Sequence, residues 1–270
     1  MSSHGMDPHS LKKASLADTI RLFVERVVAA VRTKTRYRTP LVGFAQADDP
    51  AWSMIRERVN PDHLLPTDIL PGAQSVVAFF IPFSHRVVTE NKRHFYVSPE
   101  WAQAYGETNA LIDHLCQALG RMLGDLGVLA AHQPPTHNFD PKTLRSPWSH
   151  KSVAYVAGLG EWGLHRMLIT ERGAAGRFGS LVIDAALPPT PRPDSIYCSF
   201  YRDGTCMECV KQCQVRALAV NGLDRERCHR TCMEVSFFYQ SQFGKADVCG
   251  KCVTGPCAFH PPARSKKKEG

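Results

Sequence analysis

The sequence lacks several features that mark other classes of protein. Its 270 residues contain no apolar run near the roughly 18 that a transmembrane helix needs, since the longest such run is residues 76–83. Residues 1–11 hold neither an apolar stretch nor twin arginines, so we expect no secretory signal. Glycine and proline, at 19 each, are too few for collagen or low-complexity sequence. We therefore expect a cytoplasmic globular protein with no membrane partner, built from one large or two smaller domains.

Acidic residues are fewer than basic ones, 25 against 33, which gives a formal net charge of +8. Such a balance is found in proteins that bind nucleic acid or anionic substrates. Here three of the lysines, Lys266, Lys267 and Lys268, lie in a basic tail at residues 265–270, and the other basic residues are scattered. We interpret the excess as mostly solvated surface charge. Thiolates bound to a metal cluster would offset part of it.

Cysteine is almost absent from most of the chain and dense in one part. Nine of the ten cysteines lie between Cys198 and Cys257, and only Cys116 lies outside that segment. We expect Cys116 to be a small buried hydrophobic residue within a helix. In a reducing compartment, cysteines this dense more often bind metal than form disulfides.

The first cysteine motif is Cys206-x2-Cys209-x3-Cys213. It matches the last three positions of the bacterial ferredoxin pattern C-x2-C-x2-C-x3-C, which ligates [4Fe–4S] clusters. Asp203 stands where the first cysteine of that pattern is expected. Cys198, five residues earlier, could reach the same iron through a looser loop.

The second motif is Cys249-x2-Cys252-x4-Cys257, preceded by Cys228 and Cys232. Eight thiolates serve two [4Fe–4S] clusters at four each. A C-x2-C turn wraps one cluster and the next cysteine faces its neighbour, so we expect the motifs to exchange a ligand. One cluster then takes Cys198, Cys206, Cys209 and Cys257, and the other takes Cys213, Cys228, Cys249 and Cys252.

Three alternatives to this ligand set stay open. Cys232 could replace Cys228 as the eighth ligand. A zinc ion could be held by four thiolates, those of Cys206, Cys209, Cys249 and Cys252. A disulfide framework is the third.

The periodicity of apolar residues predicts the main elements of the first 195 residues. We expect helices at residues 15–32, 99–126 and 153–163, and strands at 75–82, 167–170 and 180–185. Residues 133–148 show no period and read as a loop long enough to be functional. The proline-rich stretch 187–193 predicts a domain boundary.

Residues 149–187 carry a recognisable pattern: an A-G-L-G turn at 157–160 followed by Gly163, an L-I-T strand at 168–170, a glycine-bearing loop and a second strand. With the cysteine module downstream, this pattern resembles the corrinoid-dependent reductases, namely epoxyqueuosine reductases and reductive dehalogenases. The resemblance extends over about residues 75–259.

The resemblance implies an α/β (α+β) fold with a nitroreductase-like core at residues 1–195. A ferredoxin-like domain with two [4Fe–4S] clusters would occupy residues 196–264. The core would hold cobalamin, bound without a histidine beneath the cobalt; a flavin is the alternative, since such a core admits either. Because glycines let a backbone approach a flat ring, the residues expected at this cofactor are Gly158, Gly160, Trp162, Gly163 and Leu168.

The chain departs from the epoxyqueuosine reductase pattern in one respect. Those enzymes carry an acidic proton donor about a dozen residues before the A-G-L-G turn, where this sequence has Leu144 and Arg145. We therefore do not expect transfer RNA as a partner, although the net charge would suit it and would make its binding strongly salt-dependent.

Reductive chemistry needs a proton source within hydrogen-bond reach of the substrate. His150 is our first candidate because it lies at the start of the recognised segment, and Tyr105 and Asp140 are the others we retain. Further residues of suitable type are His85, Tyr96 and His137.

Two functions follow from these observations. The first is an oxidoreductase that takes electrons from a low-potential donor and passes them through two [4Fe–4S] clusters to a cobalamin, which reduces a small organic substrate. The second is an electron-transfer or corrinoid-reactivating protein whose client is another protein. The missing acid favours the second, and the long polar loop favours the first.

Overall fold

The structure is a computed structural model that describes residues 15–263. The expectations for residues 1–11 and for the basic tail at 265–270 lie outside this range. At the centre is a four-stranded sheet in which every neighbouring pair is antiparallel. Its strands, in spatial order, are β1 (Leu41–Gln46), β2 (Ser75–Pro82), β6 (Gly176–Ile183) and β3 (Ala130–His132).

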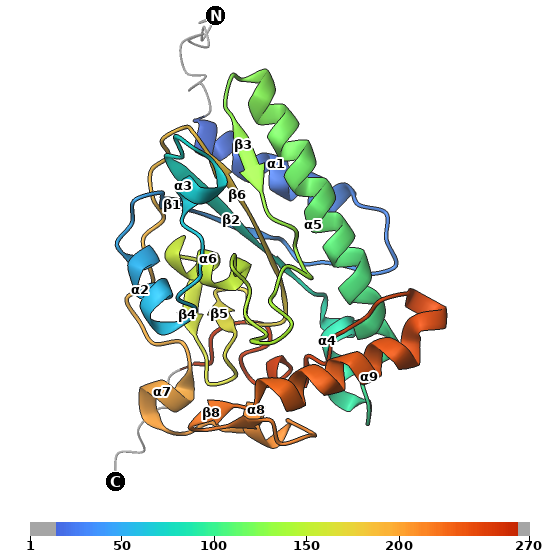
Figure 1. The fold of residues 1–270 in the computed structure, drawn as a ribbon. Coiled ribbons are helices and arrows are strands. Elements are labelled where there is room, and N and C mark those ends of the chain that lie inside the picture. Colours follow the sequence, from blue (N-terminus) through green and yellow to red (C-terminus); the bar gives the residue numbers. More distant parts are fainter. Residues whose placement is uncertain (1–14, 264–270) are drawn as a thin grey trace, which may run out of the picture.

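Helices cover both faces of this sheet (Figure 1). Helices α1 (Leu16–Ala30) and α5 (Pro99–Asp125) pack on one face, and α2 (Ala51–Arg58) and α6 (His150–Val156) pack on the other. Strand β2 is buried along its whole length because it lies between the two helical layers. Its side chains alternate between them, with Phe79 toward α1 and α5 and Phe80 toward α6.

The other elements lie around this sandwich. Before α5 come α3 (Pro66–Ile69) and α4 (His85–Arg93), and after α6 a hairpin forms from β4 (Gly160–Trp162) and β5 (Leu168–Thr170). The cysteine-rich segment lies at one end of the sheet, below this hairpin in Figure 1. Its elements are α7 (Ser199–Asp203), α8 (Glu208–Lys211), β7 (Leu218–Ala219), β8 (Gly222–Leu223), α9 (Arg225–Phe243) and η2 (Lys251–Val253).

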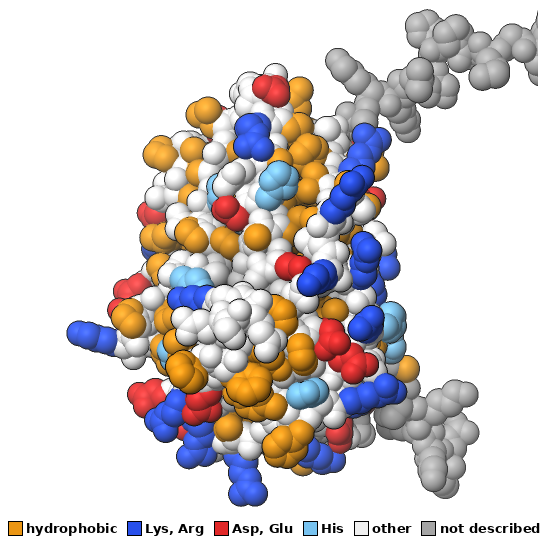
Figure 2. Space-filling view, turned by 90° about the vertical axis from the view of Figure 1, so that its right-hand side faces the viewer, with side chains coloured by type: hydrophobic (Ala, Val, Ile, Leu, Met, Phe, Trp, Pro, Cys, Tyr) orange, Lys and Arg blue, Asp and Glu red, His pale blue; other side chains and the backbone are white. Residues whose placement is uncertain are grey.

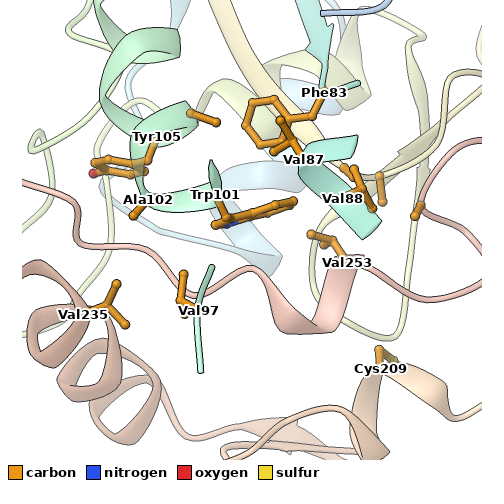
Figure 3. Close-up of a cluster of buried hydrophobic side chains, with 14 of the residues drawn as sticks. Phe83, Val87, Val88, Val97, Trp101, Ala102, Tyr105, Cys209, Val235 and Val253 are labelled. Atoms are coloured by element: carbon orange, nitrogen blue, oxygen red, sulfur yellow. The ribbon is translucent and has the colours of Figure 1, made fainter. Parts of the chain in front are cut away.

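A hydrophobic cluster joins the cysteine-rich segment to the rest of the molecule (Figure 3). We call it the Trp101 cluster, and its members include Phe83, Val87, Val88, Val97, Trp101, Tyr105, Cys209, Val235, Tyr239 and Val253. Trp101 meets the ring of Phe83 edge to face at 5.0 Å between ring centroids. Residues from both sides of the expected boundary at 195 belong to this cluster. Contacts with the residues before that boundary therefore position the cysteine-rich segment.

Buried hydrogen bonds reinforce this junction. The side-chain amide of Asn91 donates to the carbonyl of Cys249 at 3.0 Å and accepts from the amide of Ser98 at 3.1 Å. The buried ammonium of Lys251 donates to the carbonyls of Asn91 and His94. The hydroxyl of Tyr239 donates to the carbonyl of Val97 at 2.7 Å.

Several predicted elements are confirmed. Strand β2 has the predicted bounds, and α1 and α5 lie within two residues of theirs. Cys116 lies in α5, is 1% exposed, and has its thiol 3.8 Å from the carbonyl of Ser180. The mixed α/β class is confirmed, with an antiparallel sheet, while the nitroreductase-like and ferredoxin-like descriptions of its two parts stay predictions.

The predicted helix at 153–163 is wrong in its second half. Helix α6 ends at Val156 because Gly158 adopts a left-handed φ of 72°, and residues 160–162 then form a strand. The sequence also gave no signal that we recognised for β1 or for the 19-residue helix α9. Helix α9 begins after Asp224, whose carboxylate accepts the amide of Arg227.

The surface carries both signs of charge. Figure 2 shows Lys and Arg side chains together with Asp and Glu on one side of the molecule, with hydrophobic side chains between them. None of the helices in residues 15–263 is long and apolar enough to cross a membrane.

We predict that Leu119→Ala lowers the free energy of unfolding by about 2–5 kcal/mol, because it opens a cavity between α5 and the sheet. Leu126→Ala is the matched control, since Leu126 is 58% exposed, and it should change stability by less than about 0.5 kcal/mol. Denaturant unfolding measures both. Equal losses in the two variants would contradict the assigned core.

Candidate active site

Four cysteines of the first predicted set lie around one small cavity beneath the β4–β5 hairpin, namely Cys198, Cys206, Cys209 and Cys257. Burial raises the pKa of Cys209 to about 11, and the thiols of Cys198 and Cys206 add to that rise. Burial likewise raises the pKa of Cys257 to about 12, with contributions from the same neighbours. We call these four residues the outer thiol group.

A second set lies next to it, namely Cys213, Cys228, Cys249 and Cys252. Burial raises the pKa of Cys252, and Cys249, Cys228, Cys209 and Cys213 raise it further. Cys252 also lines the cavity of the outer thiol group, so the two sets adjoin. We call this second set the inner thiol group.

Cys228 and Cys232 lie one turn apart on α9 and their thiols are hydrogen-bonded. The bond lowers the pKa of Cys228 to about 7 and raises that of Cys232. Lys151 also favours the thiolate of Cys228. Cys232 therefore lies beside Cys228, a member of the inner thiol group, and the choice of ligand between the two stays open.

The alternatives to iron–sulfur binding fit this geometry less well. All ten cysteines are free, so there is no disulfide framework in the structure. The zinc alternative needs Cys206, Cys209, Cys249 and Cys252 around one ion. Cys206, Cys209 and Cys252 line the cavity of the outer thiol group, whereas Cys249 lines a different cavity. Within residues 15–263, no three His, Cys, Asp or Glu side chains are arranged to hold a single ion. A [4Fe–4S] cluster differs because its four thiolates bind four separate irons.

The inner thiol group forms one wall of a cavity of about 350 Å³, which we call the inner cavity. Cys249 and Cys252 line it on one side, together with Cys232. On the other side lie Trp101 and Tyr105 from α5 and Arg177 from β6. The inner cavity shares Thr136, Met167 and Arg177 with a neighbouring space of about 320 Å³ beneath the 133–148 loop, the loop cavity.

Polar atoms without hydrogen-bond partners collect at the inner cavity. On the residues that line this cavity, the atoms without a partner are the indole Nε1 of Trp101, Nε of Arg177, Nε2 of His229 and Oδ1 of Asp247. Asp247 Oδ1 lies 3.6 Å from His137 Nε2, and the Asp247 carboxylate also acts on Tyr105, whose pKa it raises. A buried polar atom without a partner costs about 1–3 kcal/mol, and a polar ligand or ordered water in the inner cavity would satisfy these atoms.

Tyr105 and Arg177 form a pair in this wall. The guanidinium carbon of Arg177 lies 4.4 Å from the centre of the Tyr105 ring, and the Tyr105 hydroxyl lies 3.0 Å from Thr136 Oγ1. Burial raises the pKa of Tyr105 to about 12, and the positive charge of Arg177 opposes that rise. Tyr105 is therefore protonated at neutral pH, beside a cation that stabilises its phenolate.

His150, our first candidate for the proton donor, is held on both ring nitrogens. Its Nδ1 lies 2.8 Å from the hydroxyl of Ser180 and its Nε2 lies 3.0 Å from the carbonyl of Pro134. Burial lowers its pKa to about 4, so the ring is neutral. His150 lines the loop cavity, but this geometry favours fixing the loop on β6 over donating a proton.

Asp140, the one carboxyl group among the three candidates, lines none of the three larger cavities of the site. It is exposed, and its carboxylate accepts the backbone amides of Lys142 and Thr143, which hold its pKa below its usual range. Leu144 and Arg145, where an acid was expected from the resemblance, do line the loop cavity. Of the three catalytic candidates, only Tyr105 reaches the inner cavity.

Of the five residues expected to contact a flat cofactor, two line a cavity and three do not. Trp162 and Gly163 line a third space of about 460 Å³, the outer cavity, which adjoins the loop cavity through Arg145 and Lys151. Leu168 is fully buried in the core beneath α6. A Cβ on Gly158 would lie 2.5 Å from the carbonyl oxygen of Thr190, and one on Gly160 would lie 2.1 Å from that of Ile169. These two glycines are therefore explained by close backbone packing.

Four residues that line the inner cavity were not predicted from the sequence, namely Trp101, Arg177, His229 and Asp247. Arg177 had a detectable signal, since it is a charged residue near the start of an otherwise apolar strand. The others come from α5, α9 and the segment after it, and no sequence motif joins them.

No protein-family model and no curated protein matches the sequence. The structure does match solved structures. An epoxyqueuosine reductase matches with a TM-score of 0.57 at 15% identity over 90% of this chain and 68% of that one. The Bacillus subtilis enzyme, whose catalytic aspartate loop is swung out of its active site, gives 0.57 at 16% over 91% and 68%. A catabolic reductive dehalogenase in complex with 3-bromo-4-hydroxybenzoic acid gives 0.52 at 17% over 82% and 30%.

The chain thus has the fold of the epoxyqueuosine reductases and reductive dehalogenases, which confirms the resemblance at the level of the fold. It spans about two thirds of the reductases and less than a third of the dehalogenase. An epoxyqueuosine reductase in complex with a tRNA stem-loop also matches, with a TM-score of 0.55 at 15% identity over 87% of this chain and 64% of that one. This goes against our expectation that transfer RNA is not a partner, because the same fold binds it there.

We predict that Gly160→Ala lowers the thermal stability of the protein, by about 1–3 kcal/mol, because the new Cβ collides with the backbone of β5. Gly124→Ala is the control: Gly124 lies in α5 with nothing near its would-be Cβ, and alanine there should stabilise slightly. Thermal unfolding without any added cofactor measures both. If Gly160→Ala were as stable as the parent, the close-packing explanation would fail.

We also predict a pH dependence of stability from His150. Its pKa is about 4 in the folded chain and near 6.5 when unfolded, so the unfolded chain binds more protons between these values. The free energy of unfolding therefore holds above pH 6.5 and falls as pH decreases toward 4, by up to about 1.4 kcal/mol per pH unit from this residue. His150→Gln should flatten that slope.

The matched control is His114→Gln, on the exposed side of α5. Urea unfolding at intervals from pH 7 to pH 4 compares the three proteins. A slope that is identical in His150→Gln and the parent would contradict the buried, neutral state of His150.

Proposed function

We propose that the protein is an iron–sulfur oxidoreductase that carries two [4Fe–4S] clusters and reduces a substrate in the inner cavity. The observation that carries this proposal is the wall shared by the inner thiol group and by Tyr105 and Arg177. The thiols that would hold the electron source and the candidate proton donor thus face the same space.

The position of the two thiol groups determines where each cluster would lie. The inner thiol group would hold one cluster beside the inner cavity, and the outer thiol group would hold the other beneath the β4–β5 hairpin. When bound, the two clusters would supply electrons from an external low-potential donor to the inner cavity. Cys252 lines both cavities, so the two thiol groups adjoin.

Tyr105 is our candidate proton donor and Arg177 its positioning partner. Tyr105 is protonated at neutral pH, and Arg177 stabilises the phenolate left after proton transfer. The unpartnered Nε of Arg177 and Oδ1 of Asp247 are available to orient a polar substrate. His150 and Asp140 take no part in this step.

The residues present fit a cobalamin, as in the resembling family. Its flat ring suits the inner and loop cavities, which together present unpartnered polar atoms for peripheral amide groups. When bound, the cobalt would supply one- and two-electron reduction of an organic substrate next to the inner thiol group. Trp162 and Gly163, at the outer cavity, would lie against another part of the molecule. A flavin is the smaller alternative.

The competing function is a redox partner with no organic substrate of its own. The inner cavity with its unpartnered polar atoms favours the reductase, because protein-to-protein electron transfer needs no such space. A transfer RNA nucleoside is retained as a substrate class, since a protein of the same fold binds a tRNA stem-loop. Small organic substrates are the other class.

We predict about eight irons and eight sulfides per chain after anaerobic purification. Cys209→Ser and Cys252→Ser, one from each thiol group, should each lose about half of the iron. Cys116→Ser is the matched control, because Cys116 lies in α5 far from both groups, and it should keep all of it. Zinc in place of iron, or equal iron in all three variants, would contradict the proposal.

We further predict that added cobalamin binds and shows the absorption bands of its form without the lower axial base. Titration of the iron-loaded protein followed by visible spectroscopy measures this, with flavin mononucleotide as the parallel titration. If flavin bound and cobalamin did not, flavin would take the place of cobalamin as the proposed cofactor, and the proposed reductase function would still be supported. Eight irons with affinity for neither cofactor would favour the redox-partner function.

A further inference from the structure

His165 is a buried histidine that the proposed reduction does not use. It lies in the turn that joins β4 to β5, and it is 4% exposed. Its ring lines the cavity of the outer thiol group, together with the four cysteines of that group. The ring atom Nε2 lies 3.4 Å from Sγ of Cys257, which is within hydrogen-bond distance for sulfur.

The hydrogen bond at the other ring nitrogen shows which nitrogen of His165 carries the proton. The backbone amide of Met167 donates to Nδ1 of His165 at 3.1 Å. Because Nδ1 accepts this bond, it has no proton of its own, and the proton of the imidazole is on Nε2. Nε2–H is therefore the donor in the contact with Cys257 Sγ.

The backbone holds both partners of this contact in place. The amide of Gly163 donates to the carbonyl of Met167 at 2.9 Å, which closes the turn around His165. A Cβ on Gly163 would lie 2.6 Å from Cε1 of the His165 ring, so a larger residue at position 163 would displace the ring. On the other side, the carbonyl of Cys257 accepts the amide of Ala174 at 2.9 Å. The Nε2–H donor and the thiol thus face each other without the help of a ligand.

This contact distinguishes the outer thiol group from the inner one. Among residues 15–263, His165 is the one residue with a side-chain nitrogen hydrogen-bonded to a cysteine thiol. In the inner thiol group, Sγ of Cys213 accepts the backbone amide of Leu218 at 3.3 Å. A backbone donor stays when a side chain is replaced, whereas the donor on His165 can be removed by substitution.

We propose that His165 is a positioning residue that raises the reduction potential of the cluster held by the outer thiol group, through the hydrogen bond from Nε2–H to Cys257 Sγ. Hydrogen bonds to the sulfurs are among the factors that set the potential of an iron–sulfur cluster. The proposal deepens the proposed function and rests on it, because it needs a cluster bound by these four cysteines.

The direction of the effect follows from charge. Reduction adds one electron to a cluster, and part of the added negative charge is carried by the ligand sulfurs. An N–H donor stabilises the more negative sulfur more strongly, so the bond from His165 favours the reduced form. The electron comes from the low-potential donor of the proposed reaction. His165 keeps its proton throughout, and no covalent bond forms or breaks.

A redox titration of the iron-loaded full chain with dithionite, followed by electron paramagnetic resonance, tests this role. His165→Phe keeps a buried ring and removes the donor. One of the two midpoint potentials should fall, with a loss of about threefold to tenfold in the equilibrium constant for reduction; tenfold equals about 59 mV for one electron. The affected potential should be the one that is missing in Cys209→Ser. Unchanged potentials, or a fall in the other one, would overturn the proposal.

Two further variants separate the hydrogen bond from a general effect on packing. His165→Gln keeps an N–H donor on its side-chain amide and should hold the potential near that of the parent. The matched control is His63→Phe, because His63 is also buried and its Nε2 also accepts a backbone amide, that of Ser149, at 3.2 Å. His63 lines neither cavity of the thiol groups, so both potentials should stay unchanged. Equal falls in His165→Phe and His165→Gln would show a structural role alone and contradict the proposal.

A measurement on the parent protein tests the contact without any variant. In a chain with isotope-labelled histidine, pulsed electron paramagnetic resonance of the reduced protein should show a histidine nitrogen coupled to the cluster that Cys209→Ser lacks. A parent without this coupling overturns the proposal, even if the variants at position 165 fail to fold. Failure of the proposed function is distinct, because the parent would then contain no iron. Eight irons with neither the coupling nor the potential shift would reject the role of His165 alone.

Discussion

The placement of the thiols depends on one contact surface, the Trp101 cluster. The cysteine-rich segment consists mostly of loops, two-residue strands and short helices, and it cannot bury an adequate core alone. Its residues Val235, Tyr239 and Val253 are buried against side chains of α4 and α5 instead. The hydrogen bonds of Asn91 and Lys251 add direction to this packing. The cysteine-rich segment therefore packs its hydrophobic residues against the first part of the chain. This packing positions the inner thiol group against the inner cavity.

Charge is arranged in complementary layers around the cavities. The thiols lie at one end of the molecule, and the outer cavity presents five cations near them, of which Lys151 favours the thiolate of Cys228. Between these two regions, Tyr105, Arg177 and Asp247 present polar atoms to the inner cavity. Buried thiolates attract cations, and unpaired cations attract anionic ligands.

The A-G-L-G segment shows how a motif can be recognised correctly and explained incompletely. The glycines pointed to the correct fold, yet Gly158 and Gly160 are explained by backbone contacts with Thr190 and Ile169. Sequence spacing cannot separate close approach to a ligand from close approach to another strand, because both exclude a Cβ. Similarly, His150 lies near the cavities as its sequence position suggested. Its two hydrogen bonds favour a role in holding the loop, and only the fold reveals them.

The sequence by itself determined helices α1 and α5 and strand β2, and it predicted two sets of four cysteines. A helix such as α5 and a buried strand such as β2 follow from periodicity, and cysteine spacing reflects the local geometry of a C-x2-C turn. The cavities were decided by tertiary structure alone. Tyr105, Arg177 and Asp247 lie 70 or more residues apart along the chain, as do Arg58, Arg145 and Arg225, which line the outer cavity. Each of these sets forms only when hydrophobic packing brings separate elements together, and no local pattern records that convergence.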